Sequence, residues 1–516
     1  MTKRLVLVMA AILAGLVSLG VQGDPGVVGA AAMMKTKVVF ATTADAITLD
    51  PAFISSTHER ILSLYPFDYL VTLAPDGRYG PALAESFKQL NPTTWEFKLR
   101  RGVKFHNGEP LTAATVKYTY TRVQNNSKNP NQGELSTFKD IQIVDDHTLR
   151  FVTTKFDAVF MLRILKQPIV PMAYIKDKGD DYFGQHPVGT GPYVFKEWVK
   201  NDHTTYEANP NYWGRAVPVK TVMFKPVPEY STRAALLRTG EVDFIDDVLP
   251  DQAAALAKEA GIKIHSGPTF RSYMVVLRSD RSPLDSKALR QALNYATNKE
   301  SIVKNIFRGY GVMNDGQILN PGQIGYNPEL KPYPYDPARA KELLTKAGYP
   351  NGFQGTFLTP SGQFTLDKEV SEAIAAQLGR IGVQLKVQPV EYSVYTSMQM
   401  QSKFPELSML AFGASFDGGE AYERAYVSGE PWLAGLYFKN PEVDRLLKAS
   451  VNIVDPKERD AAIRRVGTIV RDEAPLIFLH RLVKIYAARD GVPFKARPDL
   501  RVIFYPYPGN EEAFRR

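Results

Sequence analysis

The sequence predicts a mixed α/β protein with more than one lobe. Its 516 residues are too many for one hydrophobic core, because single cores rarely grow past about 250–300 residues. Strand patterns dominate the first part of the chain, and helical patterns dominate the second. At Val383–Val387 an alternating strand pattern directly follows a helical stripe, which is typical of an α/β unit.

The expected strands are short runs in which apolar residues follow one another or alternate with polar residues. Trp95, Phe97 and Leu99 alternate with charged residues. Asp145-Asp146 lies between two further strand-like runs, which predicts a hairpin. The remaining strands are expected at 37–41, 193–198, 221–224, 262–264, 273–277 and 476–479.

Five helices are expected in the second half from apolar residues spaced three and four positions apart. A capping box of Thr297 and Glu300 is expected to open the second helix, and Asp336-Pro337 the third. Asp285 and Asp455 are the expected caps of the first and last helices. The apolar stripes fall at 289–296, 302–307, 340–347, 370–381 and 463–469.

The composition excludes several kinds of chemistry. The chain has no cysteine, which removes disulfides, cysteine-ligated zinc, iron–sulfur clusters, thiol nucleophiles and a lipidated N-terminal cysteine. The formal charge of +9 is spread along the chain without a Lys/Arg-rich run of five or more residues. We therefore expect no nucleic-acid partner.

The first 32 residues predict a secretory signal peptide. Lys3 and Arg4 precede an uncharged stretch at 5–21, and small residues follow at Gly29–Ala32. A membrane anchor is the alternative, but the stretch is only moderately apolar and no stop-transfer flank follows it. No later segment reaches about 18 uncharged apolar residues. We expect a protein that is exported, cleaved and free in a periplasm.

Catalytic signatures are scarce. No two of the seven histidines lie four positions apart, as a metal pair on a helix requires. Gly189-Thr190-Gly191 is too short for a phosphate-binding loop, and Asp417 stands where a nucleophile elbow needs glycine. Two S-x-x-K matches, at Ser136 and Ser301, lack a K-T-G motif. Carboxylates that meet only in space stay open, so a secreted hydrolase remains an alternative.

An ordered series of short motifs runs through almost the whole chain. In chain order they are LDP (49–51), PDG (75–77), PALAES (81–86), WEFKLR (95–100), GVKFHNGEPLTA (102–113), VGTGPY (188–193), NPNYW (209–213), GEVD (240–243), RQALN (290–294), AKELLTKAG (340–348) and NPEVD (440–444). Each motif is weak alone, but the ordered set is specific. On these motifs the chain resembles the extracytoplasmic solute-binding proteins of ABC importers, in the family that binds peptides, nickel and opines.

Two of these motifs also have a local structural interpretation. Asn107-Gly108 is a turn signal between a strand and the next helix. Val188–Tyr193, with two glycines and a proline, predicts a tight turn before a strand. Both are positions of the scaffold, so we expect His106 to be a structural hydrogen-bonding residue and not a ligand contact.

The resemblance implies a two-lobed periplasmic-binding-protein fold of type II, an α/β architecture with an extra subdomain inserted in the first lobe. Lobe I would comprise 36–75, 187–280 and 478–516, the inserted subdomain 76–186, and lobe II 281–477. Two chain crossings would join the lobes, and the solute would bind between them. Because a ligand contacts both lobes only in the closed state, its differential affinity would drive closure.

The resemblance also implies which residues form the solute cleft. The expected ligand-binding residues are Phe53, Ser55 and Thr57 after the first motif, Phe270, Arg271 and Tyr273 in the strand that enters the hinge, and Phe412, Ser415, Asp417 and Trp432 in lobe II. Aromatic faces with a few polar groups suit a concave small-molecule site. For Phe270 and Trp432, core packing is an equal alternative.

One position departs from the family pattern. Peptide-binding relatives have a run similar to W-x-A-D-Y, whose aspartate pairs with the peptide α-ammonium, whereas the matching run here is FGASF (412–416). Ser415 brings no charge, so the charge-assisted part of that contact is missing. Asp417 could replace it, or could be a cap residue at the surface. Arg271, if it faces the cleft, would favour a carboxylate or another anionic group.

The expected function is that of a monomeric, non-enzymatic binding protein without a cofactor or a resident metal. Its expected solute is a short peptide, an opine-like compound or an organic acid, which it would hand to the transmembrane subunits of an ABC permease. Besides the hydrolase, a nickel or haem scavenger of the same family is an alternative.

Overall fold

The computed structural model describes residues 33–514 except Ser55, Asp76, Lys128, Ala414 and 431–433, and it does not describe the side chain of Thr57. The expected signal peptide therefore lies outside the described residues. The chain from Met34 onward forms one compact unit. Within the described part, no helix is long and apolar enough to cross a membrane.

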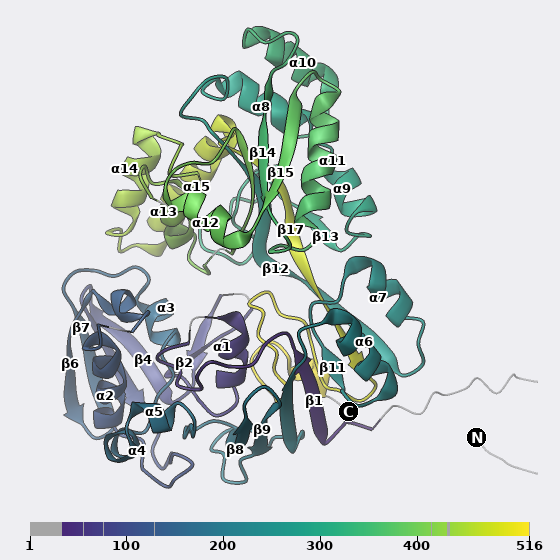
Figure 1. Cartoon of the computed structure of the whole chain (residues 1–516). Coiled ribbons are helices and arrows are strands. Elements are labelled where there is room, and N and C mark those ends of the chain that lie inside the picture. The colour runs from purple at the N-terminus through teal and green to yellow at the C-terminus, as the bar shows by residue number, and fades with distance from the viewer. Residues whose placement is uncertain are drawn as a thin grey trace, which may run out of the picture. The chain divides into compact units, whose positions relative to one another are not determined.

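An eleven-stranded mixed sheet runs through both lobes (Figure 1). In spatial order its strands are β15 (Gln384–Val390), β14 (Gln354–Pro360), β16 (Leu407–Gly413), β12 (Ile262–Leu277), β17 (Leu476–Arg489), β11 (Phe244–Ile245), β1 (Lys37–Thr42), β10 (Thr221–Pro226), β9 (His203–Ala208) and β8 (Tyr193–Val199), and β13 (Gly311–Met313) pairs with β17. Parallel pairing links β1 to β10 and β11, and β14 to β15 and β16. The mixed α/β class expected from the sequence is confirmed.

Two long antiparallel strands connect the lobes. β12 and β17 pair from Ile262 opposite Arg489 to Val276 opposite Leu476, with a register shift between Pro268 and Ser272. At one end β17 pairs with β11, and at the other end β12 pairs with β16. The separate strands expected at 262–264 and 273–277 are parts of this one strand β12. The chain crosses between the lobes through β12 and β17 (Figure 1).

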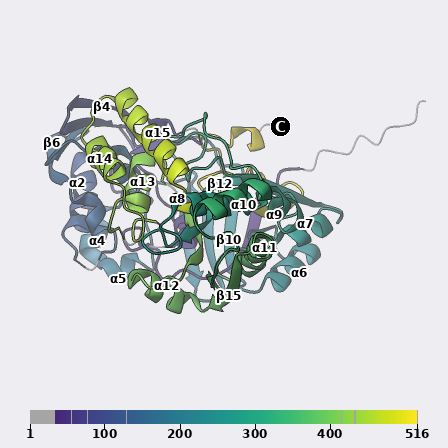
Figure 2. The same ribbon diagram turned by 90° about the horizontal axis from the view of Figure 1, so that it is seen from above.

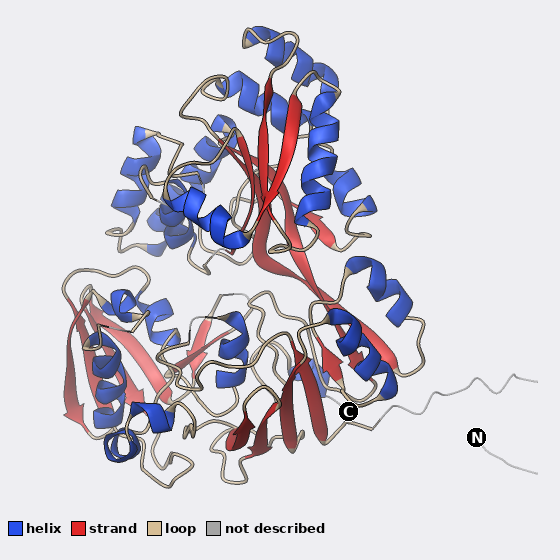
Figure 3. Ribbon diagram, in the orientation of Figure 1, coloured by secondary structure: helices blue, strands red, loops and turns tan. Residues whose placement is uncertain are grey.

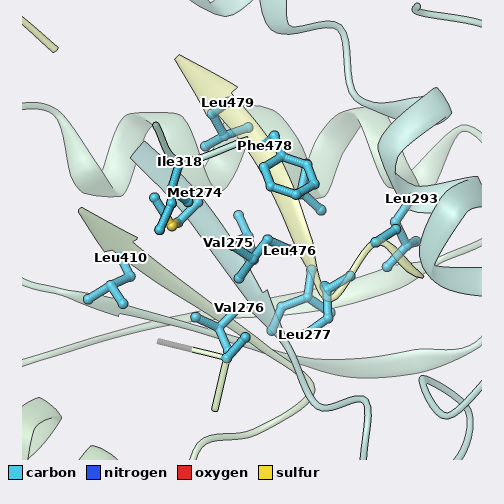
Figure 4. Close-up of a cluster of buried hydrophobic side chains, with 14 of the residues drawn as sticks. Met274, Val275, Val276, Leu277, Leu293, Ile318, Leu410, Leu476, Phe478 and Leu479 are labelled. Carbon is cyan, nitrogen blue, oxygen red and sulfur yellow. The ribbon is translucent and has the colours of Figure 1, made fainter. Parts of the chain in front are cut away.

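Helices cover the strands of lobe II on both sides (Figure 3). They are α8 (Lys287–Ala296), α9 (Lys299–Asn305), α10 (Pro337–Lys346), α11 (Asp367–Gly379), α12 (Tyr392–Met400), α13 (Gly418–Tyr426), α14 (Pro441–Ser450) and α15 (Pro456–Glu473). Figure 4 shows part of the core beneath them, where Met274 and Val276 of β12, Leu410 of β16 and Phe478 of β17 lie together.

Two of the expected helix caps are wrong and two are confirmed. The cap of α8 is Ser286, one residue after Asp285, and the cap of α9 is Asn298. The expected box fails because the Thr297 hydroxyl donates to the Leu293 carbonyl of the preceding helix. The carboxylates of Asp336 and Asp455 cap α10 and α15 as expected: Asp336 accepts the N–H of Arg339, and Asp455 accepts those of Lys457 and Glu458.

Lobe I surrounds the other half of the large sheet. Its helices are α1 (Thr57–Ser63), α6 (Tyr230–Thr239) and α7 (Pro250–Leu256). Buried aromatic residues of β1, β10 and β11, Phe40, Phe224 and Phe244, pack with Phe504 of the C-terminal segment. This segment follows β17 back into lobe I and reaches the cleft between the lobes.

The inserted subdomain has its own sheet and its own core. Its sheet order is β4 (Ala84–Asn91), β5 (Thr94–Leu99), β7 (Thr148–Thr153) and β6 (Phe138–Asp145), with α2 (Ala113–Gln124), α3 (Phe160–Leu165), α4 (Met172–Lys178) and α5 (Asp180–Phe183), and a ribbon of β2 (Val71–Leu73) and β3 (Tyr79–Pro81) precedes it. The expected hairpin is confirmed as β6–β7. Viewed along two directions, α13–α15 of lobe II lie over this subdomain (Figures 1 and 2).

His106 joins the inserted subdomain to the turn before β8. Its Nδ1 accepts the backbone N–H of Gly189 at 3.3 Å, and its Nε2 lies 3.0 Å from the Gly191 carbonyl oxygen. Two motifs that are distant in the sequence therefore meet through one imidazole. The expected structural role of His106 is confirmed.

Candidate functional site

A cavity of about 400 Å³ opens between the two lobes and the inserted subdomain. This volume lies in the range of small-molecule sites. Lobe I contributes α1 and a C-terminal loop, the inserted subdomain contributes α3, the hinge strand β12 contributes its middle, and lobe II contributes the segment from the end of β16 into α13. The lining residues used below are Arg60, Leu162, Leu165, Lys166, Phe270, Arg271, Ser415, Phe416, Glu420, Arg424, Asp499 and Arg501.

Phe270 and Arg271 bring the hinge strand to the cavity. The ring of Phe270 meets the ring of Phe416 edge to face, with centroids 4.7 Å apart. Arg271 is half-buried, and its guanidinium has no ion pair or hydrogen bond with another residue that the structure describes. Two of the residues predicted from the sequence thus line the cavity together, and one of them brings to it a positive charge without an ion pair among the described residues.

Ser415 also lines the cavity, and a carboxylate lies beside it. The Ser415 hydroxyl donates to Oε2 of Glu420 at 2.6 Å, and its backbone carbonyl accepts from the Gln323 side chain. Glu420 stands in the first turn of α13 and faces the same cavity. The negative charge missing at Ser415 is therefore supplied five residues later, by a residue that sequence reasoning missed.

Asp417 is placed elsewhere. It is buried, caps α13 by accepting the N–H of Glu420 at 3.0 Å, and binds both terminal nitrogens of the Arg459 guanidinium. Its charge is already neutralised inside lobe II, and it does not line the cavity. Asp417 is therefore a helix cap, which was one of the two interpretations from the sequence. It differs from that interpretation in being buried and not at the surface.

Three other expected residues lie away from the cavity lining. Tyr273 is buried in lobe II, where its ring stacks on His480 with centroids 4.8 Å apart and its hydroxyl donates to the Thr365 carbonyl at 3.2 Å. Phe412 is buried beneath the Arg424 guanidinium. Phe53 packs on the core of the inserted subdomain. Ser55 and Trp432 lie outside the described residues, and Thr57 is the first residue of α1.

A charged loop near the C-terminus was not predicted as part of the site. Arg501 lies 3.5 Å from Asp499, and donates to the Tyr507 hydroxyl at 2.6 Å. Burial alone would raise the pKa of Asp499, but Arg501 and Arg497 lower it below its ordinary value. These charges neutralise one another and hold the loop against the cavity. The residues follow Phe270 by more than two hundred positions, so no local sequence pattern could connect them.

The charged lining is predominantly positive. Arg60, Lys166, Arg271, Arg424 and Arg501 face two carboxylates, those of Glu420 and Asp499. Arg501 is paired with Asp499, and Lys166 lies 2.9 Å from Glu134 and 3.7 Å from Glu420. Arg60, like Arg271, has no ion pair with another described residue. The cavity is therefore suited to a solute with carboxylate or other anionic groups.

Nothing in the described residues suggests a metal centre. No group of three or more His, Asp or Glu side chains is arranged to hold a metal ion in the part of the chain that the structure describes. Oxygen and nitrogen ligands of this kind would have to converge within about 2–2.6 Å of one point. The polar groups of the cavity suit hydrogen bonding and ion pairing with a solute.

Comparison with known proteins agrees with this architecture. Residues 78–432 match the family described as "Bacterial extracellular solute-binding proteins, family 5 Middle". The glutathione-binding protein GsiB of Salmonella choleraesuis (strain SC-B67) is 30% identical over 464 residues, which cover 86% of this chain and 89% of that protein.

Two solved structures share the fold. HbpA2 from Haemophilus parasuis has a TM-score of 0.82 at 23% identity and covers 91% of this chain and 99% of its own. The ABC transporter-associated periplasmic binding protein DppA from Helicobacter pylori, in complex with the peptide STSA, has a TM-score of 0.73 at 25% identity and covers 92% and 99%. The family match and the likeness to GsiB support solute binding over the hydrolase alternative. The chain belongs to family 5 of the bacterial extracellular solute-binding proteins.

Proposed function

We propose that the chain captures a short peptide or amino-acid-derived solute with at least one carboxylate, and delivers it to the permease of an ABC importer. The observation that carries this proposal is the pair of guanidinium groups, Arg60 and Arg271, that face the cavity without an ion pair among the described residues. A carboxylate between the lobes would meet positive charge from α1 of lobe I and from the hinge strand, and would favour the closed state.

The relatives support this class of solute. GsiB is named for glutathione, a tripeptide with two carboxylates and one ammonium group. DppA was solved with the peptide STSA. In the present cavity, carboxylates have arginine partners, and an ammonium group has Glu420 within the same lining. Of the residues predicted from the sequence, Phe270, Arg271 and Ser415 are those we propose as solute contacts.

The test is thermal unfolding of the purified chain with reduced glutathione, the peptide STSA, agropinic acid and glutathione diethyl ester. A solute at a hundredfold excess over its Kd stabilises the folded state by about 2.7 kcal/mol. We expect stabilisation by at least one of the free acids and little by the ester, whose carboxylates are masked. Because the chain has no cysteine, glutathione cannot act by forming a mixed disulfide. Equal stabilisation by glutathione and its ester would contradict the proposal.

Binding without turnover is the second part of the proposal. After incubation and release by denaturation, the bound solute should be recovered with unchanged mass. Recovery of a cleaved or otherwise converted product would favour the hydrolase alternative. On a sizing column with light scattering, the chain should run as a monomer with and without solute.

We also infer that the protein is exported and that its lobes divide near residues 76, 186, 280 and 478. The basic start and the apolar stretch of the first 32 residues support export. The separate hydrophobic cores of lobe I, the inserted subdomain and lobe II support the division. Mass spectrometry of the protein from a periplasmic extract should show loss of about 30 residues. An intact N-terminus would contradict cleavage, and recovery from the cytoplasmic fraction alone would contradict export.

A further inference from the structure

The inserted subdomain and lobe II meet at the cavity through an ion pair. Lys166, which ends α3, places its Nζ 3.7 Å from Oε1 of Glu420 in α13. The same ammonium lies 2.9 Å from Glu134 of its own subdomain. The side chains of Lys166 and Glu420 are about one third and one fifth exposed, and both line the cavity. One contact thus connects two parts of the protein and borders the site.

The charges around this ion pair are complementary. On the lobe II side, burial and the neighbouring Glu430 and Glu420 raise the pKa of Glu423, and Lys155 and Arg163 of the inserted subdomain oppose that rise. On the other side, burial alone would raise the pKa of Glu134, but Lys166 and Arg163 hold it below its ordinary value. Glu420 and Glu423 of α13 therefore face basic side chains of the inserted subdomain, and Arg424 of the same helix also lowers the pKa of Glu134.

A second contact with lobe II lies at the β2–β3 turn, where the chain enters the inserted subdomain. A Cβ atom on Gly77, whose φ is +83°, would lie 3.0 Å from the Gly322 carbonyl oxygen and 4.0 Å from the Phe416 ring. Phe416 also packs on the core of the inserted subdomain while its ring meets Phe270 in the cavity. The two parts are therefore in contact on the uncharged side of the cavity as well.

We propose that the inserted subdomain is a third side of the solute site, and that the ion pair of Lys166 and Glu420 stabilises the arrangement in which this subdomain closes on α13. The proposal rests on the proposed function, because it places the solute in this cavity. Leu162 and Leu165 of α3 would contact an apolar part of the solute. The ion pair of Lys166 and Glu420 would hold the inserted subdomain and lobe II together around this apolar part of the solute.

The distance between the two parts can be measured without knowing the solute. Because the chain has no cysteine, Asn125→Cys and Ser393→Cys introduce two unique thiols, on exposed positions of the inserted subdomain and of α12. Nitroxide labels on them report the separation by pulsed electron paramagnetic resonance. The measurement is made without solute, at low and high salt, and then with reduced glutathione as the probe.

Four variants of the labelled protein form a double-mutant cycle: the parent, Lys166→Gln, Glu420→Gln and both together. We expect each single substitution to lower the ratio of short to long distances by about two- to fivefold, and the double variant to lower it no further. High salt should act on the parent and not on the double variant. Lys117→Gln, which removes an exposed ion pair with Asp140 inside the subdomain, is the matched control and should change nothing.

Two results would overturn the inference. One is an unchanged distance distribution in both single variants. The other is an additive effect of the two substitutions, which would show that the side chains act independently. Thermal unfolding of each variant identifies loss of fold separately. If no solute of the panel binds but the double-mutant cycle shows coupling, the proposed solute class is wrong, and the contact between the inserted subdomain and lobe II is supported. If solutes bind but the cycle shows no coupling, the proposed function is supported and only this inference fails.

Discussion

Asp417 and Arg459 form a buried ion pair with two contacts at the start of α13. The carboxylate oxygens lie 2.5 and 2.7 Å from the two terminal guanidinium nitrogens, and the side chains are only 3% and 6% exposed. The same carboxylate caps the helix that carries Glu420 into the cavity. The site therefore depends on a charge pair that never touches the cavity.

Replacing Asp417 by asparagine should destabilise lobe II strongly, because it leaves the buried Arg459 charge without a partner. Removing one member of a buried pair costs about 3–5 kcal/mol. Urea unfolding should show this loss, and hydrogen exchange should show reduced protection of the α13 amides. Glu442→Gln removes a surface pair with Arg465 and should cost about 0–1 kcal/mol. If Asp417→Asn and Glu442→Gln lowered the free energy of unfolding equally, the pair of Asp417 and Arg459 would not behave as a buried ion pair.

Arg271→Gln should weaken solute binding and leave stability unchanged. The guanidinium has no partner among the described residues, so its loss leaves no charge unpaired in the fold. A hydrogen bond to a charged group is worth about 1.5–3 kcal/mol, which corresponds to a rise in Kd of roughly ten- to a hundredfold. Calorimetry with a carboxylated solute from the panel measures it. Arg339→Gln, at an exposed arginine paired with Glu342, is the control for the change in net charge. An equal rise in Kd for Arg339→Gln would show that Arg271 acts only through the long-range charge of the protein.

The strand β12 shows what the sequence could predict of the fold and what it could not. Its two ends carry the apolar residues typical of strands, whereas Gly267 and Pro268 between them are residue types that strands rarely contain. Continuity comes from pairing with β17, which lies about two hundred positions later. Local patterns do not contain such pairing. The lobe boundaries stay a prediction.

The candidate site likewise contains residues that the sequence could predict and residues that it could not. Phe270, Arg271 and Ser415 were predicted because the family resemblance places the hinge strand and the run 412–416 at the cleft, and they share one cavity. Lys166 and Arg501 were missed because only folding brings α3 and the C-terminal loop to that cavity. Glu420 had a usable signal: Asp417 and Glu420 are spaced like the ends of a capping box, which predicts a helix starting there with a carboxylate in its first turn.

Two histidines, the partly buried His106 and the buried His480, should make stability depend on pH. Burial lowers the pKa of His106 to about 4 and that of His480 to about 3. Unfolded histidine has a pKa near 6.5, so the unfolded chain binds more protons as the pH falls from about 7 to 4, and the free energy of unfolding falls with it. Asp68, whose pKa burial raises to about 7, acts in the opposite direction, because the folded state holds its proton longer.

The prediction therefore concerns how much stability the parent and a histidine variant each lose as the pH falls. Between pH 7 and pH 5, His106→Gln should lose about 2 kcal/mol less stability than the parent, measured by urea unfolding at both pH values. Equal losses in the parent and His106→Gln would show that His106 takes up its proton as readily in the folded state as in the unfolded state.

Asp50 of lobe I holds the inserted subdomain through an ion pair. Loss of this pair should weaken the attachment of the subdomain to lobe I. Both oxygens of this buried carboxylate accept from the Arg122 guanidinium of α2, one of them at 3.0 Å, and Arg122 also binds the more exposed Asp180 at 2.7 Å. Burial alone would lower the pKa of Arg122, but Asp50 and Asp180 raise it above its ordinary value. A subdomain that closes on lobe II needs such a fixed attachment on its other side.

Asp50→Asn should cost about 3–5 kcal/mol of unfolding free energy, because the buried arginine loses its main partner. Asp180→Asn removes the partially exposed partner of the same guanidinium and should cost about 0–1 kcal/mol. Urea unfolding, followed by circular dichroism, compares them directly. Asp50→Asn should also broaden the distance distribution between labels at positions 125 and 393, since α2 would no longer be held to lobe I. A narrow, unchanged distribution in a folded Asp50→Asn variant would show that the core of the subdomain, and not this ion pair, orients it.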